Sequence, residues 1–171
     1  MSAATDPFVA IDFETANESP DSACALALVR VENQRIVRKE VCLIRPGSAR
    51  FTFSDIHGIS WADVQDERPF AEVWEDAQTI LDGVQHFAAH NASFDKRVLT
   101  ACCQRAKLSV PSIPFVCTVK VARAVWNIRP TKLPDVCRAL SIRLRHHDPA
   151  SDAEACARII VKAGQAGWNY E

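Results

Sequence analysis

The sequence lacks the features that mark several classes of protein. It has no apolar run of about 18 residues, so no segment is predicted to span a membrane. Residues 1–6 lack the basic and apolar stretches of a secretory signal peptide. With 20 basic and 21 acidic residues the net charge is −1, which excludes a strongly basic nucleic-acid binder of the histone kind. A nucleic-acid enzyme with a local basic face remains compatible with this balance.

The cysteines do not form a pattern typical of disulfides or of a cysteine-bound zinc ion. There are seven of them, an odd number, and none is arranged as Cys-x-x-Cys. Several lie within apolar periodic segments, which is typical of small buried side chains in a reducing compartment. We therefore expect a cytoplasmic protein without disulfides.

Length and hydrophobic patterning predict one α/β domain over residues 1–171. The chain has 48% hydrophobic and 24% charged residues, as globular domains do. Apolar runs at 8–11, 23–31 and 35–44 predict strands, the last two joined as a hairpin, and short runs at 87–89 and 115–117 predict two more. Helices are predicted at 70–82, 92–106, 118–126, 133–140 and 149–163. This order predicts a mixed sheet with an antiparallel hairpin on one side and parallel strands on the other.

Two carboxylates follow the first predicted strand and need an explanation. Asp12 and Glu14 are two residues apart, so they project from the same face of that strand. Like charges at this distance repel one another, and a divalent cation would remove the repulsion. A strand that ends in a solvated polar loop explains the pair equally well.

Two predicted helices each aim one further acid toward the interior. Asn91 is predicted to cap the helix at 92–106, and Asp95 then shares the apolar stripe of Val98 and Leu99. Asp148 is predicted to cap the last helix, with Pro149 in its first position.

In that last helix Asp152 aligns with the apolar residues, whereas Glu154 falls on the polar face. Four acids could thus converge, and an oxygen-only site of this kind suits Mg²⁺ or Mn²⁺ rather than zinc. His147, five residues before Asp152, is a candidate for taking a proton from water.

Three motifs resemble those of the DEDDh, or DnaQ-like, 3′–5′ exonucleases, which include the proofreading subunit of bacterial DNA polymerase III. They are Asp12-Phe13-Glu14-Thr15, His90-Asn91-Ala92-Ser93-Phe94-Asp95, and His147 followed by Asp152. The resemblance extends over about residues 7–163. It implies an RNase H-like fold, with a mixed five-stranded sheet flanked by helices. It also implies hydrolysis of a nucleic acid from its 3′ end, with two Mg²⁺ or Mn²⁺ ions and release of nucleoside 5′-monophosphates.

The resemblance also implies roles for individual residues. Asp12, Glu14, Asp95 and Asp152 match the metal-binding acids and His147 matches the general base. Thr15, His57 and Phe94 match positions near the terminal nucleotide, whereas His90 and Asn91 are expected to be structural. Pro149 stands where the family usually has Ala.

The expected substrate is a single-stranded or frayed 3′ end, with DNA favoured over RNA. Arg129, Lys132, Arg138, Arg143 and Arg145 precede His147 and could follow a strand through its phosphates. An exoribonuclease that trims RNA or short oligonucleotides, and a catalytically inactive binding or docking module, are the alternatives. We expect no polymerase- or clamp-binding tail after residue 163, and the sequence does not indicate an oligomeric state.

Overall fold

A five-stranded mixed sheet forms the centre of the molecule, as expected. The computed structural model describes residues 7–170. The strand order is β3-β2-β1-β4-β5, with bounds β1 (Phe8–Thr15), β2 (Ala23–Glu32), β3 (Arg35–Leu43), β4 (His86–Ala89) and β5 (Phe115–Cys117). The strands β1, β2 and β3 pair antiparallel, whereas β4 is parallel to both β1 and β5.

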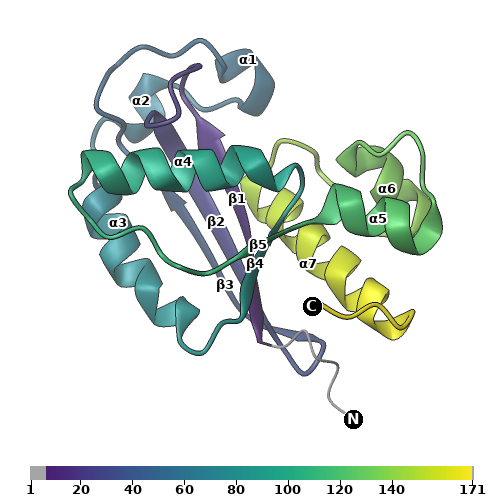
Figure 1. The fold of residues 1–171 in the computed structure, drawn as a ribbon. Helices are drawn as coiled ribbons and strands as arrows, with labels where there is room; N and C mark the ends of the chain where they lie inside the picture. Colours follow the sequence, from purple (N-terminus) through teal and green to yellow (C-terminus); the bar gives the residue numbers. More distant parts are fainter. Residues whose placement is uncertain (1–6, 171) are drawn as a thin grey trace.

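Seven α-helices and one 3₁₀ helix accompany the sheet within the described residues. They are α1 (Ser54–His57), α2 (Trp61–Val64), α3 (Phe70–Ala77), η1 (Gln78–Leu81), α4 (Ala92–Arg105), α5 (Thr118–Trp126), α6 (Leu133–Ala139) and α7 (Pro149–Gln165). In Figure 1, α3 and α4 lie on one side of the sheet, and α5, α6 and α7 lie on the other.

The alternation of side chains along β1 divides the core into two halves. Val9, Ile11 and Phe13 pack with residues of α3 and α4. Phe8 and Ala10 pack with residues of α5, α6 and α7. Side chains two residues apart on a strand share a face. Asp12 and Glu14 therefore project from the same face of β1 as Phe8 and Ala10, toward α7.

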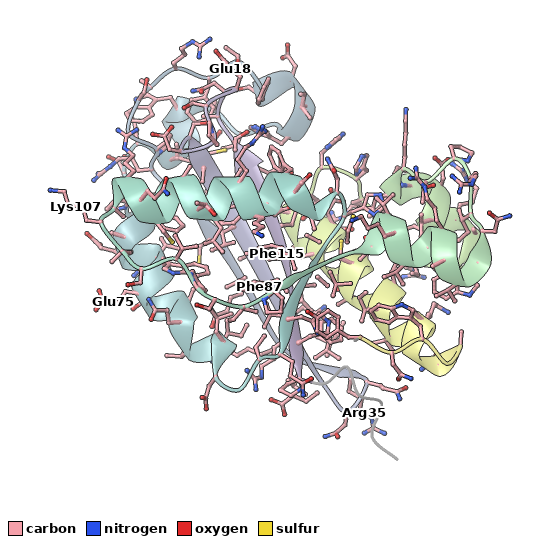
Figure 2. All side chains as sticks on the ribbon, in the orientation of Figure 1. Glu18, Arg35, Glu75, Phe87, Lys107 and Phe115 are labelled. Carbon is pink, nitrogen blue, oxygen red and sulfur yellow. The ribbon has the colours of Figure 1, made fainter. Side chains whose placement is uncertain are left out.

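An aromatic contact joins the two parallel strands β4 and β5. The rings of Phe87 in β4 and Phe115 in β5 lie 4.9 Å apart, centroid to centroid. Phe87 is fully buried and Phe115 is partly buried, whereas Glu18, Glu75 and Lys107 lie at the periphery of the molecule in Figure 2. The core on the α3 and α4 side of the sheet is apolar. A charged group that is buried there therefore needs an explanation.

The predicted elements differ from the observed ones mainly at their ends. The helix predicted at 70–82 stops at Ala77 and continues as the tighter η1. The short helices α1 and α2 fall in a stretch for which the sequence predicted no helix. Four residues are too few to show a helical period, so hydrophobic patterning cannot reveal such helices. Within the described part of the chain, no helix is long and apolar enough to cross a bilayer.

Candidate functional site

The site lies at the end of β1, where its pairing with β4 stops. β4 pairs only with Phe8, Val9 and Ala10, although β1 continues to Thr15. Asp12 and Glu14 therefore stand on a stretch of the central strand that has β2 on one side and no parallel neighbour on the other. This geometry brings two carboxylates into the middle of the molecule while keeping them at an accessible end of the sheet.

Asp95 occupies the space beyond the end of β4. It lies in the first turn of α4, only 2% exposed, and its Oδ1 accepts a hydrogen bond of 3.0 Å from the backbone N–H of Phe13. This bond ties α4 to β1 between the two acids of the strand. The predicted capping by the Asn91 side chain is wrong. Asn91 adopts a left-handed conformation with φ of 61° and makes no side-chain cap, and its carbonyl instead accepts from the N–H of Phe94.

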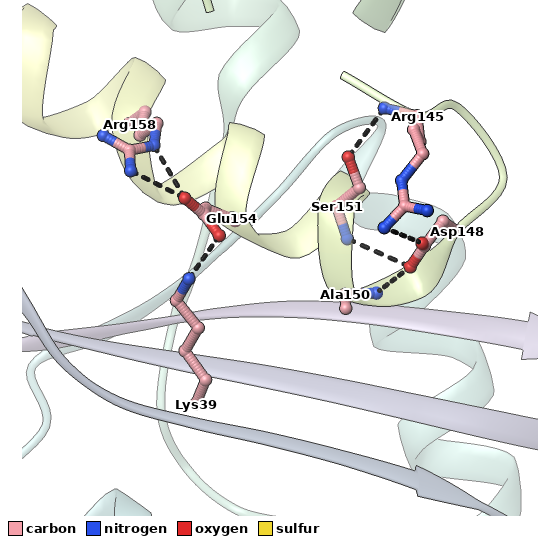
Figure 3. A network of polar contacts seen from close by, with 7 residues as sticks. All are labelled: Lys39, Arg145, Asp148, Ala150, Ser151, Glu154 and Arg158. Atoms are coloured by element: carbon pink, nitrogen blue, oxygen red, sulfur yellow. Dashed lines mark hydrogen bonds and ion pairs between the residues drawn. The ribbon is translucent and has the colours of Figure 1, made fainter. Parts of the chain in front are cut away.

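Asp152 lies in the first turn of α7, on the face of the sheet opposite to α4. The helix begins at Pro149, as predicted. The Asp148 carboxylate caps this helix by accepting from the N–H groups of Ala150 and Ser151, at 3.1 and 3.3 Å (Figure 3). The side chain of Asp152 is 6% exposed. Glu154, predicted on the polar face of this helix, pairs with Lys39 of β3 and with Arg158 (Figure 3). The cap and this pairing fix the register at which Asp152 points inward.

Carboxylate oxygens of Asp12, Glu14 and Asp152 all lie within 4.8 Å of one another. Asp12 Oδ2 is buried, and it has no hydrogen-bond partner among the described residues. Leaving a buried oxygen unpaired is costly, and a bound cation would provide its partner. The donor set and the unpaired oxygen therefore fit a divalent metal. Asp95 lies beside this trio rather than within it.

The pKa of every acid in the site is raised. Burial, followed by the charge of Asp95, raises the pKa of Asp12 well above its ordinary value. Burial and the charge of Asp152 raise the pKa of Glu14 to about 7. Burial also raises the pKa of Asp95 to about 8, and that of Asp152 in the same direction. The metal-free site thus resists full ionisation, which a divalent cation would reverse.

His147 lies at the rim, exposed, in the loop before α7. Its φ is 67°, and its backbone N–H donates to Asp152 Oδ2 at 3.1 Å. Burial first, and then the neighbouring His146, lower the pKa of its ring. A lowered pKa keeps the imidazole neutral near neutral pH, the form that accepts a proton.

His146 is the residue that the sequence analysis missed. Its Nδ1 lies 3.2 Å from Asp152 Oδ2, and its ring stacks on that of His147 with centroids 3.8 Å apart. The pair of adjacent histidines before a capped helix was the available signal, but spacing alone could not show which ring faces Asp152.

The residues expected near a terminal nucleotide lie close to one another, around Thr15. Ile59 N–H donates to His57 Nδ1 at 3.1 Å, so Nε2 carries the proton and donates to the Thr15 carbonyl at 3.0 Å. Phe94 lines a cavity of about 190 Å³ that also includes Thr15, Phe53 and Arg97. The rings of Phe53 and Phe94 give this cavity an apolar wall.

His90 is structural, as expected. Its Nε2 lies 2.9 Å from the carbonyl of Thr131 and its Nδ1 lies 2.8 Å from the hydroxyl of Thr118. Both ring nitrogens are therefore engaged, and the ring links α5 to the loop before α6.

The predicted basic stretch lies at the surface. Its five members, Arg129, Lys132, Arg138, Arg143 and Arg145, are all exposed. Arg138 pairs with Asp135 and Arg145 with Asp148. Arg143 and Arg145 also line a cavity of about 540 Å³ with Lys39. Positive charge is thus available close to the start of α7, although part of it is paired.

Comparison with known proteins places this geometry in a family. Residues 9–160 match the model of the exonuclease family RNase T. The 3′–5′ exonuclease DinG of Bacillus subtilis (strain 168) is 32% identical over 163 residues, which cover 91% of this chain and 17% of that protein. A DNA polymerase III of the PolC type from Oceanobacillus iheyensis is 34% identical over 165 residues, or 94% of this chain and 12% of that protein. The chain thus spans less than a fifth of the length of these relatives.

Solved structures show the same fold. Exonuclease X in complex with 5′ overhanging duplex DNA is 26% identical with a TM-score of 0.75, and the match covers 95% of this chain and 94% of that one. A 3′-exonuclease solved with a histone mRNA stem-loop has a TM-score of 0.79 at 20% identity, over 96% and 84% of the two chains. The expected RNase H-like fold is confirmed.

Proposed function

Because the chain belongs to the RNase T family of exonucleases, we propose that it hydrolyses DNA from the 3′ end and releases nucleoside 5′-monophosphates. The observation that carries this proposal is the trio of Asp12, Glu14 and Asp152, whose oxygens lie within 4.8 Å of one another. A binding module without activity would have no need for such a costly cluster. The proposal treats residues 1–171 as one exonuclease domain with its core at about 7–163.

Asp12, Glu14, Asp95 and Asp152 hold two Mg²⁺ or Mn²⁺ ions in this proposal. When bound, two such ions stabilise charge on the attacking and leaving oxygens of a phosphodiester. Asp12 and Glu14 provide carboxylates from the rigid central strand, and Asp152 provides one from α7. Asp95, fixed by the N–H of Phe13 at 3.0 Å, sets the separation between α4 and the strand. The chain thereby supplies a preformed cradle.

His147 is the proposed general base, and it removes a proton from the attacking water. Its lowered pKa and its exposed position suit a group that must exchange protons with solvent. Thr15 and His57 hold the 3′ hydroxyl end, and Phe94 packs against the terminal base. His57 acts mainly by fixing the Thr15 backbone, since both of its ring nitrogens are already engaged.

The proposed substrate is a single-stranded or frayed 3′ end of DNA. Exonuclease X, similar over almost its whole length, was solved with DNA, and the PolC-type relatives are DNA polymerases. We also propose a reducing, cytoplasmic compartment, because all seven cysteines are unpaired and five of them are buried.

The proposal is tested with matched DNA and RNA oligonucleotides labelled at the 3′ or the 5′ end. With Mg²⁺ or Mn²⁺, the 3′-labelled DNA should lose its label at once as a mononucleotide, and the 5′-labelled DNA should shorten gradually. Asp12→Asn should remove this activity, whereas Glu75→Gln, at an exposed acid of α3 (Figure 2), should retain it. Faster degradation of RNA would indicate the exoribonuclease, and full activity in EDTA would contradict the proposal.

A further inference from the structure

A second group of possible metal ligands overlaps the acidic one. His146, His147 and Asp152 each offer a ligand atom, and these atoms lie within 4.8 Å of one another. His146 Nδ1 already lies 3.2 Å from Asp152 Oδ2. The two groups share Asp152, but this one contains two imidazoles, whereas the acidic trio contains only oxygens.

His146 and His147 differ from the other three histidines in the exposure of their rings. Both ring nitrogens of His57 and both of His90 lie within hydrogen-bond distance of polar groups. His86 is fully buried at 0% exposure. His146 and His147, by contrast, are exposed. Among residues 7–170, these two are therefore the histidines whose rings can turn toward an ion without breaking the core.

The chemistry of the group selects a different ion from the one the acids select. Imidazole nitrogen suits Zn²⁺ and similar transition metals, whereas Mg²⁺ takes oxygen ligands. Three protein ligands with a fourth position open to water are a common arrangement for Zn²⁺. The rings of His146 and His147 are already stacked, with centroids 3.8 Å apart. The side chain of His146 is 39% exposed, so its ring can rotate toward a shared ion without displacing core residues.

We propose that His146, His147 and Asp152 form a Zn²⁺ site, and that its occupation inhibits the nuclease. Zinc would withdraw Asp152 from the acidic trio and occupy the imidazole of His147. The second part of this proposal rests on the proposed function, whereas the binding itself does not. Zn²⁺ and Mg²⁺ would therefore compete through the one residue that their sites share.

Calorimetric titration with Zn²⁺ in excess Mg²⁺ tests the binding directly, without substrate. His146→Asn leaves an amide that can still donate to Asp152 but removes the imidazole. We expect its zinc affinity to fall by at least about tenfold. Mutating a residue that only hydrogen-bonds to a metal ligand already lowers metal affinity by about that factor, and His146 is proposed as a ligand itself. The control is Cys42→Ser with Cys117→Ser, which removes the two cysteines that are not buried and should leave zinc affinity unchanged. Unchanged affinity in His146→Asn, or its loss in the cysteine control, would overturn the site.

Inhibition is measured as the zinc concentration that halves each protein's own zinc-free rate. That concentration should rise by at least about tenfold in His146→Asn relative to the unsubstituted chain. Equal inhibition of both proteins would overturn the inhibitory role. If the chain showed no nuclease activity, the proposed function would fail while the calorimetric result still decided the site.

Discussion

Replacing Glu14 with Gln should stabilise the metal-free protein at alkaline pH. Glu14 is half-buried on β1, and burial together with the charge of Asp152 raises its pKa from 4.5 to about 7. The native state therefore retains a proton that the unfolded chain has lost between these two pH values. Stability must fall as the pH rises through this range, because the native state binds more protons. Gln has nearly the same shape and no charge, so it removes this loss.

The size of the effect follows from the pKa. A rise from 4.5 to about 7 corresponds at most to about 3 kcal/mol of unfolding free energy. Solvent screening of a half-buried group reduces this figure to about 2 kcal/mol. Below pH 4.5 the native carboxyl group and the amide are both neutral, so the two proteins should be about equally stable there. The gain from the substitution should appear only as the pH rises.

Urea denaturation in EDTA at pH 5 and pH 8 measures the difference. The excess stability of Glu14→Gln should grow by about 2 kcal/mol between the two conditions. Added Mg²⁺ should stabilise the unsubstituted protein more than the variant, because a ligand that binds only the native state shifts unfolding. An excess that stays constant with pH would refute the reasoning, since it would show that native Glu14 ionises as it does in the unfolded chain.

Further outcomes follow from the same geometry. Asp152→Asn should abolish nucleotide release while raising the melting temperature in EDTA, and a lower melting temperature would show that the carboxylate stabilises the fold. His147→Ala should lower kcat by about two to four orders of magnitude with the same Mn²⁺ requirement, whereas His146→Ala should have a mild effect. The reverse result, a mild loss in His147→Ala and a large one in His146→Ala, would assign the base to His146 instead. A circular single-stranded DNA should survive while its linear form is degraded, and rapid cutting of the circle would mean endonuclease action. His90→Ala should reduce the free energy of unfolding by about 1–3 kcal/mol, because Thr118 and Thr131 lose their partner, and an unchanged urea midpoint would contradict this structural role.

Sequence reasoning reached most of the fold because its signals are local and strong here. The hairpin of 23–31 and 35–44 appears with nearly the predicted bounds. The strand predicted at 8–11 begins as expected but continues to Thr15, because the apolar run that marked it stops at Ile11 while the pairing with β2 goes on through Asp12 and Glu14. Asp148 and Pro149 define the start of α7 as predicted. The two four-residue helices carry no period. Asn91 looks like a cap, but its left-handed backbone moves its side chain away from that role.

The site was predictable as a set of residues but not as an arrangement. Four acids, Asp12, Glu14, Asp95 and Asp152, could be identified from their positions. Two adjoin an apolar strand and two lie on the apolar stripe of a helix, where a carboxylate without a function is unfavourable. Spacing could not show that Asp95 binds the backbone N–H of Phe13 while the other three cluster. It also could not show that His146 turns toward Asp152, since the rotamers of adjacent residues depend on the packing of the whole loop.

The alternation along β1 also bears on how the chain folds. Ile11 and Phe13 enter one half of the core, and Asp12 and Glu14 point to the other face. A slip of β1 by one residue against β2 would exchange these faces, placing two carboxylates among the apolar residues of α3 and α4. Such a mispaired strand would be penalised by the desolvation of both charges. The acids that make the strand chemically useful therefore also protect it from the wrong register, and neutralising them should make misfolded pairings easier to populate.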